Sequence, residues 1–318
     1  MERVLITGAD GFVASHLIEE LARERGCEII GIGLKEAPSV NANLLDYMVM
    51  DITECEQVLH LLDEKRPDSI FHLAAVPSVA LSWEDPWATY KVNVLGQVNL
   101  MEAARKLGLE PSVLITCSSE EYGKVSPEEM PIVESAPLNP CSHYAVSKVA
   151  QEALGFMYHE AFTWRVLVTR GFNQCGPRQS SNFVVSSFAR QIAEIEVGAR
   201  EPVLMAGNLE AKRDFMDVRD TVRAYRAIME KGNAGAAYNV CSGRARPASQ
   251  VLEMLLDISG AEIEVRRDPS RRRPSDIPVL LGDNTRLRKE TGWEPAIEFE
   301  TTLEDTLDYW RNRVQKGV

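Results

Sequence analysis

Short apolar segments alternate with longer amphipathic segments through the first half of this 318-residue chain. Apolar runs bounded by turn residues are typical of buried strands, and apolar residues at helical spacing predict helices that cover those strands. This βαβα order predicts an α/β fold built on a Rossmann-type, doubly wound parallel sheet. The predicted strands are residues 4–6, 28–32, 47–50, 69–73, 112–116 and 165–169, and the predicted helices are residues 12–25, 54–65, 86–107 and 143–162.

A glycine-rich turn, Thr7-Gly8-Ala-Asp-Gly11-Phe12-Val13, joins the first predicted strand to the first predicted helix. Glycines permit a tight turn and the close approach of a pyrophosphate, and the helix N-terminus supplies N–H groups for it. A glycine turn by itself is often only a turn, but a strand before it and a helix after it favour dinucleotide binding. The cofactor contacts predicted here are Gly8, Gly11, Phe12 and Val13.

The end of the second strand bears on which dinucleotide is bound. It reads Gly33-Leu34-Lys35, where an NAD site usually has an acidic residue for the ribose 2′-hydroxyl. No acid stands at 33 or 34, Glu36 lies just beyond, and Lys35 can meet a 2′-phosphate as a point charge. We therefore expect NADP(H), with NAD(H) left open because Lys35 also fits an exposed loop charge.

The pattern loosens after Gly171. Helical spacing recurs near 183–197, 247–258 and 301–314, and residues 238–240 are typical of a strand. We predict an NADP-binding domain over residues 1–175, which segments near 214–240 rejoin. Residues 176–318 are predicted to form mainly a smaller α/β substrate-binding domain.

Tyr144 and Lys148 lie four residues apart on the helix predicted for 143–162, so they share one face. A lysine ammonium beside a phenol favours the phenolate and lowers its pKa, which makes the pair able to transfer a proton. A packed tyrosine beside a solvated lysine has the same spacing. Ser118 and Ser119 follow the strand predicted for 112–116, where a hydroxyl can bind a substrate carbonyl opposite Tyr144, although serines there also form turns.

Composition excludes several other classes of function. The net charge of −12 argues against binding to nucleic acid. Six scattered cysteines without a Cys-x-x-Cys pair predict reduced thiols and no metal site. There is no charged leader before an apolar core and no stretch of about 18 apolar residues, so we expect a cytoplasmic protein that does not enter a membrane.

Together these motifs resemble the extended short-chain dehydrogenase/reductase family, which contains nucleotide-sugar epimerases, dehydratases and reductases. The motifs are Thr7-Gly-x-x-Gly11, Asp51-Ile52, His72-Leu-Ala-Ala75, Asn93, Ser118-Ser-Glu-Glu-Tyr-Gly123, Tyr144-x-x-x-Lys148, Arg170-Gly-Phe-Asn173 and Gly176-Pro177. The resemblance implies that Ser118, Tyr144 and Lys148 are catalytic. The further cofactor contacts that it implies are Asp51, Ile52, Leu73, Ala74, Ala75, Tyr144 and Lys148.

Two segments, residues 207–220 and 273–283, resemble the GDP-mannose branch of the family, and most of all its GDP-6-deoxy-4-keto-mannose reductases. This implies NADPH-dependent reduction of the C4 keto group of GDP-4-dehydro-6-deoxy-D-mannose, giving GDP-D-rhamnose or its C4 epimer. Arg213 and Arg273 would then bind the diphosphate, since arginine pairs well with its oxygens. The implied substrate contacts are Ser119, Asn173, Arg190, Arg213 and Arg273.

Other activities of the family stay open. Glu120 stands two residues before Tyr122, where 4,6-dehydratases place a catalytic glutamate. Against a dehydratase, Leu34-Lys35 stands where GDP-mannose dehydratases carry an Arg-Arg pair, and the chain is shorter than that group. A C4 epimerase and a non-catalytic NADP-binding sensor are further alternatives, and the intact Ser118, Tyr144 and Lys148 argue against the sensor. Because helices like 86–107 and 143–162 form the dimer interface of many relatives, we expect a homodimer.

Overall fold

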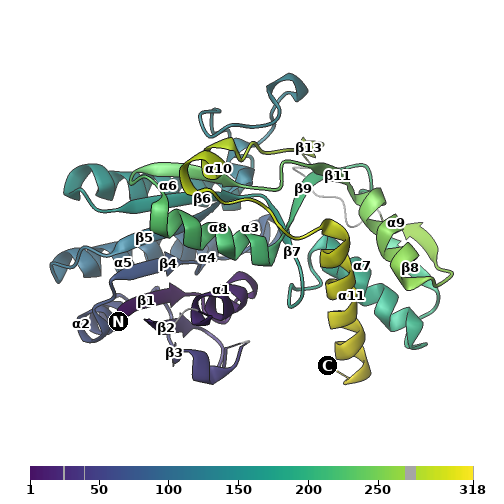
Figure 1. The fold of residues 1–318 in the computed structure, drawn as a ribbon, viewed down its shortest axis with the longest axis horizontal. Helices are drawn as coiled ribbons and strands as arrows, with labels where there is room; N and C mark the ends of the chain where they lie inside the picture. The colour runs from purple at the N-terminus through teal and green to yellow at the C-terminus, as the bar shows by residue number, and fades with distance from the viewer. Residues whose placement is uncertain (24–25, 39, 269–276, 318) are drawn as a thin grey trace.

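The computed structural model of the protein describes residues 1–23, 26–38, 40–268 and 277–317. Within that part of the chain, seven parallel strands form one large sheet (Figure 1). They are β1 (Glu2–Thr7), β2 (Cys27–Gly33), β3 (Asp46–Val49), β4 (Ser69–His72), β5 (Ser112–Ser118), β6 (Val166–Gly171) and β10 (Ala236–Val240). Their spatial order is β10-β6-β5-β4-β1-β2-β3. The predicted α/β fold with a Rossmann-type parallel sheet is therefore confirmed.

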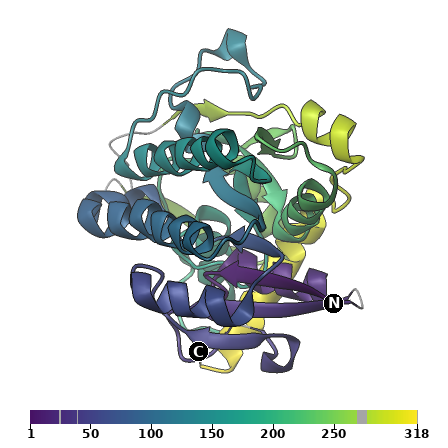
Figure 2. The same cartoon turned by 90° about the vertical axis from the view of Figure 1, so that its left-hand side faces the viewer.

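Both faces of the large sheet are buried under helices (Figure 2). One face is covered by α1 (Phe12–Ala22), α8 (Val218–Lys231) and α10 (Thr285–Thr291), and the other by α2 (Cys55–Lys65), α5 (Gly96–Lys106) and α6 (His143–Phe162). Val4 and Ile6 pack with the first set of helices, whereas Leu5 packs with the second. Successive side chains of a strand point to opposite faces, so a sheet covered on both sides requires this unbroken apolar run.

A smaller part of the chain lies beside the large sheet (Figure 1). It contains α7 (Val184–Glu196), α9 (Ala248–Ser259) and α11 (Phe299–Gln315), which share a separate apolar core. Strands β7 (Asn173–Cys175), β9 (Lys212–Asp217), β11 (Ala245–Pro247) and β13 (Val279–Leu280) form a second sheet, and β8 (Val203–Ala206) pairs with β12 (Glu264–Arg267). The predicted division of the chain at residue 175 stays a prediction.

Most predicted elements lie close to their expected bounds, and α6 spans residues 143–162 as predicted. Residues 86–107, predicted as one helix, instead form α4 (Pro86–Tyr90), a π-helical turn η2 (Lys91–Leu95) and α5. Helix α8 was not predicted, although Val218, Val222, Tyr225 and Ile228 recur at helical spacing. The remaining short helices are η1 (Ala42–Leu44), α3 (Val79–Glu84), η3 (Ser119–Tyr122) and η4 (Pro127–Glu129).

None of the helices in the described ranges is long and apolar enough to span a membrane. The cytoplasmic location expected from the sequence stays a prediction.

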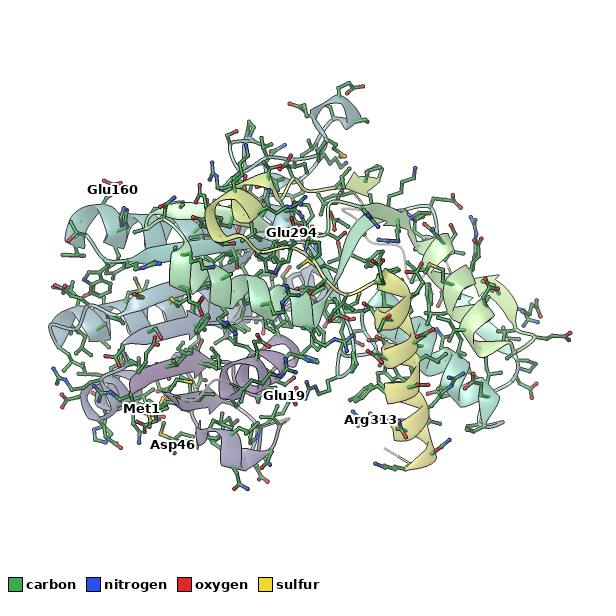
Figure 3. The ribbon with its side chains drawn as sticks, viewed as in Figure 1. Met1, Glu19, Asp46, Glu160, Glu294 and Arg313 are labelled. Carbon is green, nitrogen blue, oxygen red and sulfur yellow. The ribbon has the colours of Figure 1, made fainter. Side chains whose placement is uncertain are left out.

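The segment after β7 is tied to α1 by a buried histidine and an arginine. Arg178 donates to both carboxylate oxygens of Glu19, at 2.6 and 2.8 Å, and to Nδ1 of His16 at 2.8 Å. Because a guanidinium has only donors, Nδ1 accepts, and Nε2 therefore carries the proton donated to the carbonyl of Pro177 at 3.0 Å. Arg178 has φ +75°, a conformation rare for its type, and these contacts hold it there. Glu19 lies at the side of α1 that faces the smaller part (Figure 3).

These contacts predict a specific dependence of stability on pH. Burial lowers the pKa of His16 to about 4 from 6.5, with Arg178 also lowering it and Glu19 and Asp217 opposing. As the pH falls, the unfolded chain binds this proton before the folded protein does. The stability that neutral His16 contributes is therefore fully present above pH 6.5 and is lost as the pH falls toward 4. Between pH 4 and 6.5, we expect His16→Gln to reduce the slope of the unfolding free energy against pH by up to about 1.4 kcal/mol per pH unit. Urea denaturation at several pH values measures this slope. The lowered pKa of His72 is common to both proteins, so equal slopes would contradict the assignment.

Candidate active site

The predicted cofactor residues gather where the order of the strands reverses. β1 and β4 are neighbours in the sheet, and the chain leaves β1 for β2 on one side while β4 leads to β5 on the other. In open parallel sheets, ligands bind at the carboxyl edge at such a point. Here Thr7 Oγ1 accepts hydrogen bonds from the backbone N–H groups of Leu73 at 3.1 Å and Ala74 at 3.0 Å. The loop after β4, which also contains Ala75, is thereby held against the glycine turn.

The glycine turn packs too closely to admit a side chain at its first glycine. Gly8 has φ +68°, and a Cβ there would lie 2.9 Å from both N and Cα of Ala74. Gly11 precedes α1 and donates to the Gly8 carbonyl at 2.9 Å, and no side chain caps the helix. As the N-cap residue, Gly11 has no side chain to bond the N–H groups of the first turn, at Phe12 and Val13, and the turn fits the pyrophosphate of a dinucleotide.

The other predicted cofactor contacts follow β2 and β3 at the same edge of the sheet. Lys35 follows β2, and its Nζ donates to the backbone carbonyl of Asp10 at 2.9 Å. Asp51 follows β3, and its Oδ1 accepts the N–H of Thr53 at 2.9 Å. Ile52 is buried, and all of these residues lie on the side of the sheet edge nearer to β3.

α6 brings Tyr144 and Lys148 to the end of β5. Ser142 caps the start of the helix by accepting the N–H of Ala145 at 3.1 Å. The Tyr144 hydroxyl is hydrogen-bonded to Ser118, the last residue of β5. Lys148 Nζ lies 5.8 Å from the centre of the Tyr144 ring and donates to the carbonyl of Thr116 at 2.7 Å. The three residues predicted to be catalytic therefore lie together.

Burial is the main influence on the charges of this group. It raises the pKa of Tyr144 above its usual range, and the hydrogen bond with Ser118 only partly opposes it. It also lowers the pKa of Lys148. The expectation that Lys148 would lower the pKa of Tyr144 is wrong in this structure, because desolvation of the phenolate is the larger effect. Tyr144 is therefore protonated at neutral pH, as an ordinary phenol is, and its raised pKa makes it a weaker proton donor than a free phenol.

Glu120 and Glu121 are adjacent in η3 but have different surroundings. Glu120 is half-buried, and its charge helps to raise the pKa of Tyr144. Glu121 is fully buried, and its Oε1 accepts the N–H of Ser118 at 3.4 Å. Burial and the neighbouring Glu152 raise the pKa of Glu121 to about 8. Both carboxylates raise the pKa of Tyr144, Glu120 more than Glu121, and Glu121 also supports Ser118.

A buried ion-pair network lies behind Ser118. The Arg170 guanidinium donates to Glu152 at 2.5 and 2.8 Å, and its Nε lies 3.4 Å from Glu121. Cys117, Glu121 and Glu152 have potential metal-ligand atoms within 4.8 Å of one another. Arg170 already supplies the positive charge that these two carboxylates need, so we interpret the group as structural.

The predicted substrate residues do not all come together. Asn173 lies in β7 and is paired with Phe215 of β9. Arg213 lies two residues before Phe215 in β9, so Asn173 and Arg213 both belong to the second sheet just beyond β6. Arg213 stands opposite Arg246 of β11. Ser119 is only 3% exposed, which leaves little surface for a substrate. Arg273 lies outside the described residues.

Arg190 makes contacts away from the group around Tyr144. It donates to Glu194 at 2.7 Å and Ser181 at 3.2 Å, and its guanidinium lies 5.7 Å from the ring centre of Trp310 in α11. These contacts place Arg190 against the C-terminal helix, and none of them connects it with Tyr144.

No role was predicted from the sequence for two buried residues that hold loops near the site. Asn93, in η2, is fully buried; it accepts the N–H of Val76 at 2.7 Å and donates to Ser147 at 2.8 Å. Asp214 accepts the N–H groups of Ser242 at 2.8 Å and Gly243 at 2.9 Å, and burial raises its pKa to about 6. For Asn93 the available signal was a polar residue between Val92 and Val94, but it does not identify the partner.

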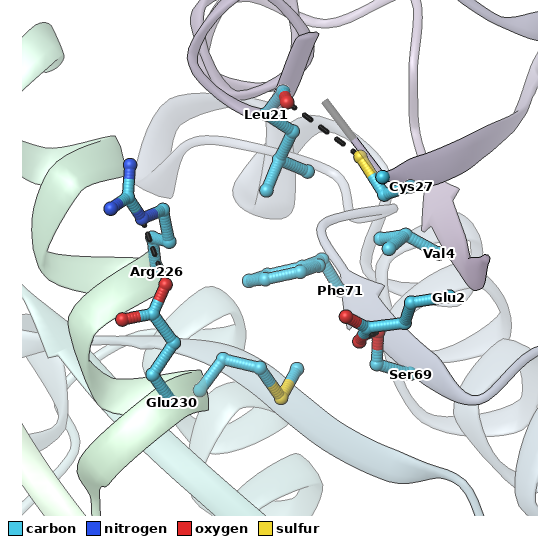
Figure 4. A pocket seen from close by; sticks show the side chains of 10 residues that line it. Glu2, Val4, Leu21, Cys27, Ser69, Phe71, Arg226 and Glu230 are labelled. Atoms are coloured by element: carbon cyan, nitrogen blue, oxygen red, sulfur yellow. Dashed lines mark hydrogen bonds and ion pairs between the residues drawn. The ribbon is translucent and has the colours of Figure 1, made fainter. Parts of the chain in front are cut away.

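Two cavities lie away from this edge of the sheet. One of about 260 Å³ lies at the amino ends of β1 and β4, opposite Tyr144 (Figure 4). It is lined by Glu2, Val4, Leu21, Gly26, Cys27, Ser69, Phe71, Arg226, Met229 and Glu230. The other, of about 520 Å³, lies between α7 and α11 beside Arg190. Neither contributes to the group around Tyr144.

The glycine turn, the reversal point of the strands and the Ser118–Tyr144–Lys148 group define a dehydrogenase-type enzyme of the Rossmann fold. Comparisons with known proteins agree. Residues 5–306 match the family described as GDP-mannose 4,6 dehydratase. The chain belongs to the extended short-chain dehydrogenase/reductase family, the NAD-dependent epimerases and dehydratases, and its enzymes modify nucleotide sugars.

Individual relatives include several activities. The chain is 36% identical to GDP-6-deoxy-D-mannose reductase of Pseudomonas aeruginosa, with 99% of each chain covered. It is 31% identical to UDP-glucose 4-epimerase of Mycolicibacterium smegmatis, covering 98% of this chain and 100% of the other. A solved structure of RMD from Pseudomonas aeruginosa complexed with NADPH has a TM-score of 0.88 and 34% identity, covering 98% of this chain and 100% of that one.

The buried network behind Ser118 generates a prediction about stability. Arg170→Leu leaves Glu152 buried without its cation, and we expect the unfolding free energy to fall by about 3–5 kcal/mol. Arg190→Leu is the matched control, because its ion pair with Glu194 is half exposed and is worth about 0–1 kcal/mol. Urea denaturation at neutral pH measures both. Equal losses for the two variants would contradict the assigned role of Arg170.

Proposed function

We propose that the protein reduces the C4 keto group of GDP-4-dehydro-6-deoxy-D-mannose with NADPH, giving GDP-D-rhamnose or its C4 epimer. The observation that carries this proposal is the half-buried Tyr144, whose phenol is hydrogen-bonded to Ser118 and has Lys148 Nζ 5.8 Å from its ring centre. Reduction of a ketone requires a proton donor at the carbonyl oxygen, whereas oxidation of an alcohol requires a base there. Full-length similarity to a GDP-6-deoxy-D-mannose reductase supports the same direction.

The roles of the residues follow from their positions. Ser118 orients the keto oxygen, and Tyr144 gives its phenol proton to that oxygen as negative charge develops on it. The ammonium of Lys148, buried beside the ring, then stabilises the phenolate. A bound NADPH would supply the hydride for C4, held at the Gly8 turn and along Leu73–Ala75. Much of the rate acceleration should come from holding the two reacting carbons close together and correctly oriented.

The substrate's diphosphate is assigned to arginines of the second sheet. Arg213 and Arg246 are neighbours across β9 and β11, and two guanidinium groups match the charge of a diphosphate. Asn173 on the adjoining β7 is proposed to line the sugar site. The predicted contact from Arg273 stays a prediction.

A GDP-mannose 4,6-dehydratase is the second candidate, favoured by the position of Glu120 near Tyr144. Such an enzyme uses a carboxylate to remove a proton next to the keto carbon while water leaves C6. A C4 epimerase is the third candidate, because the chain is similar to a UDP-glucose 4-epimerase. Both restore their cofactor in each turnover. Only a reductase consumes NADPH stoichiometrically.

The proposed reaction predicts stoichiometric loss of NADPH absorbance when GDP-4-dehydro-6-deoxy-D-mannose is supplied, and none with GDP-mannose. Tyr144→Phe should bind NADPH normally but lose at least about a hundredfold in turnover, because the proton donor is gone. Tyr158→Phe is the matched control on the same helix, since that hydroxyl bonds to Glu102 instead.

Formation of a keto sugar from GDP-mannose without net NADPH loss, abolished by Glu120→Gln, would make the protein a dehydratase. Unchanged turnover of Tyr144→Phe would remove the assigned mechanism altogether.

We also propose that the protein is a homodimer formed across α4, η2 and α6. Exposed apolar side chains gather on these elements and on the preceding α3, although most large apolar residues are buried. Trp87 is 86% exposed and Met157 is 50% exposed. The others are Trp83, Leu95, Val146 and Phe162. Exposed apolar side chains concentrated on a few elements are typical of an interface between subunits.

The proposed dimer predicts that Trp87→Glu weakens self-association at least about tenfold, because a charge would replace an aromatic anchor. Val197→Glu, at an exposed apolar residue after α7, is the matched control. Sedimentation velocity over a range of concentrations measures both. A wild-type protein that remains monomeric at high micromolar concentration would overturn the proposal.

A further inference from the structure

The end of β2 contains an acidic group that comes from another part of the chain. The backbone N–H of Lys35, just beyond β2, donates to Asp10 Oδ2 at 3.1 Å. A Cβ on Gly33 would lie 2.5 Å from Asp10 Oδ1 and 2.7 Å from its Cγ. The Asp10 carboxyl group therefore fills the space that a side chain at position 33 would occupy. A larger residue at position 33 would displace this carboxylate.

That location is where the ribose of a dinucleotide is recognised. Asp10 belongs to the turn between Gly8 and Gly11, which is proposed to hold the pyrophosphate, and it reaches across to the neighbouring strand. Sites that select NAD usually place an acid at the end of β2, where it accepts a hydrogen bond from the ribose 2′-hydroxyl. Asp10 supplies an acid at this place even though residues 33 and 34 are not acidic.

The surrounding contacts fix the geometry of Asp10. Tyr47 donates to the carbonyl of Lys35 at 2.7 Å, and a Cβ on Gly33 would lie 2.8 Å from the same hydroxyl. Burial raises the pKa of Tyr47, and the negative charge of Asp10 raises it further. The loop after β2 is thus held on both sides of the carboxylate.

Lys35 provides the opposite charge at the same place. Its Nζ donates to the carbonyl oxygen of Asp10 at 2.9 Å, so an ammonium and a carboxylate both lie near the proposed 2′ position. A 2′-phosphate would be attracted to Lys35 and repelled by Asp10, whereas a 2′-hydroxyl can donate to Asp10 at no electrostatic cost.

We propose that Asp10 sets the choice of cofactor: its carboxylate binds the 2′-hydroxyl of NADH, opposes the 2′-phosphate of NADPH and allows the enzyme to use both. This inference rests on the proposed cofactor site and deepens it. Lys35 acts in the opposite sense, so the preference for NADPH is set by the balance between the two residues.

The test is direct measurement of dissociation constants for NADPH and NADH by isothermal titration calorimetry, without any sugar nucleotide. Asp10→Asn keeps an oxygen that can accept the Lys35 N–H but removes the charge. We expect it to tighten NADPH and weaken NADH, which changes the ratio of the two constants about tenfold toward NADPH. Lys35→Gln should change the ratio in the opposite direction. Gly33→Ala, which displaces the carboxylate by sterics, should act in the same direction as Asp10→Asn.

Glu36→Gln is the matched control, because it removes the same charge from an exposed position in the same loop. An unchanged ratio in Asp10→Asn, with a thermal midpoint like that of the wild type, would overturn the inference and leave the proposed reductase intact. A shift in Glu36→Gln alone would assign the role to Glu36 instead. Failure of the wild type to bind either nucleotide would overturn the cofactor site as well.

Discussion

The hydrogen bonds of Asn93 determine how the two halves of the proposed site face each other. Its amide accepts the N–H of Val76, next to the loop that packs on the glycine turn, and donates to Ser147. Ser147 in turn donates to the carbonyl of Tyr144 at 2.7 Å. The bond from Asn93 to Ser147 is buried, where an unpaired polar group would cost about 1–3 kcal/mol, so the cofactor loop and the start of α6 are held in one arrangement. The π-helical turn at η2 is the local distortion that accompanies this arrangement, as such turns often do at functional sites.

The large sheet explains why the charged residues are arranged in pairs. Because both its faces are covered, charged groups that enter the interior lose their hydration and must find partners there. Arg170 satisfies Glu152 in this way, and Glu121, with its raised pKa, turns its other oxygen to the N–H of Ser118. The same desolvation raises the pKa of Tyr144. Burial at the carboxyl edge therefore accounts both for the paired charges behind Ser118 and for the raised pKa of the phenol.

Local patterns predicted local structure well, because helix and strand periodicity depend on neighbouring residues. The bounds of α6 are those expected, and the glycine turn lies between β1 and α1 as expected. Contacts between distant residues could not be obtained in this way. The acid at the end of β2 comes from Asp10, 23 positions before Gly33 in the printed sequence, and Arg190 stacks on Trp310 at the far end of the chain. The pKa of Tyr144 was predicted in the wrong direction because spacing shows the lysine nearby but not the burial that outweighs its charge.

The exposed end of β2 bears on which activity the site suits. Leu34 is 67% exposed, and Lys35 and Glu36 are exposed beside it. A reductase must release its spent nucleotide in every turnover, whereas a dehydratase or an epimerase regenerates it in place and gains from holding it tightly. Exposed charges bind a nucleotide weakly because water and salt screen them. Opposing charges at one position also lower the affinity for either form of the nucleotide. An open adenosine end that carries both Asp10 and Lys35 is therefore suited to a nucleotide that exchanges, and it favours the reductase over the two activities that retain their cofactor.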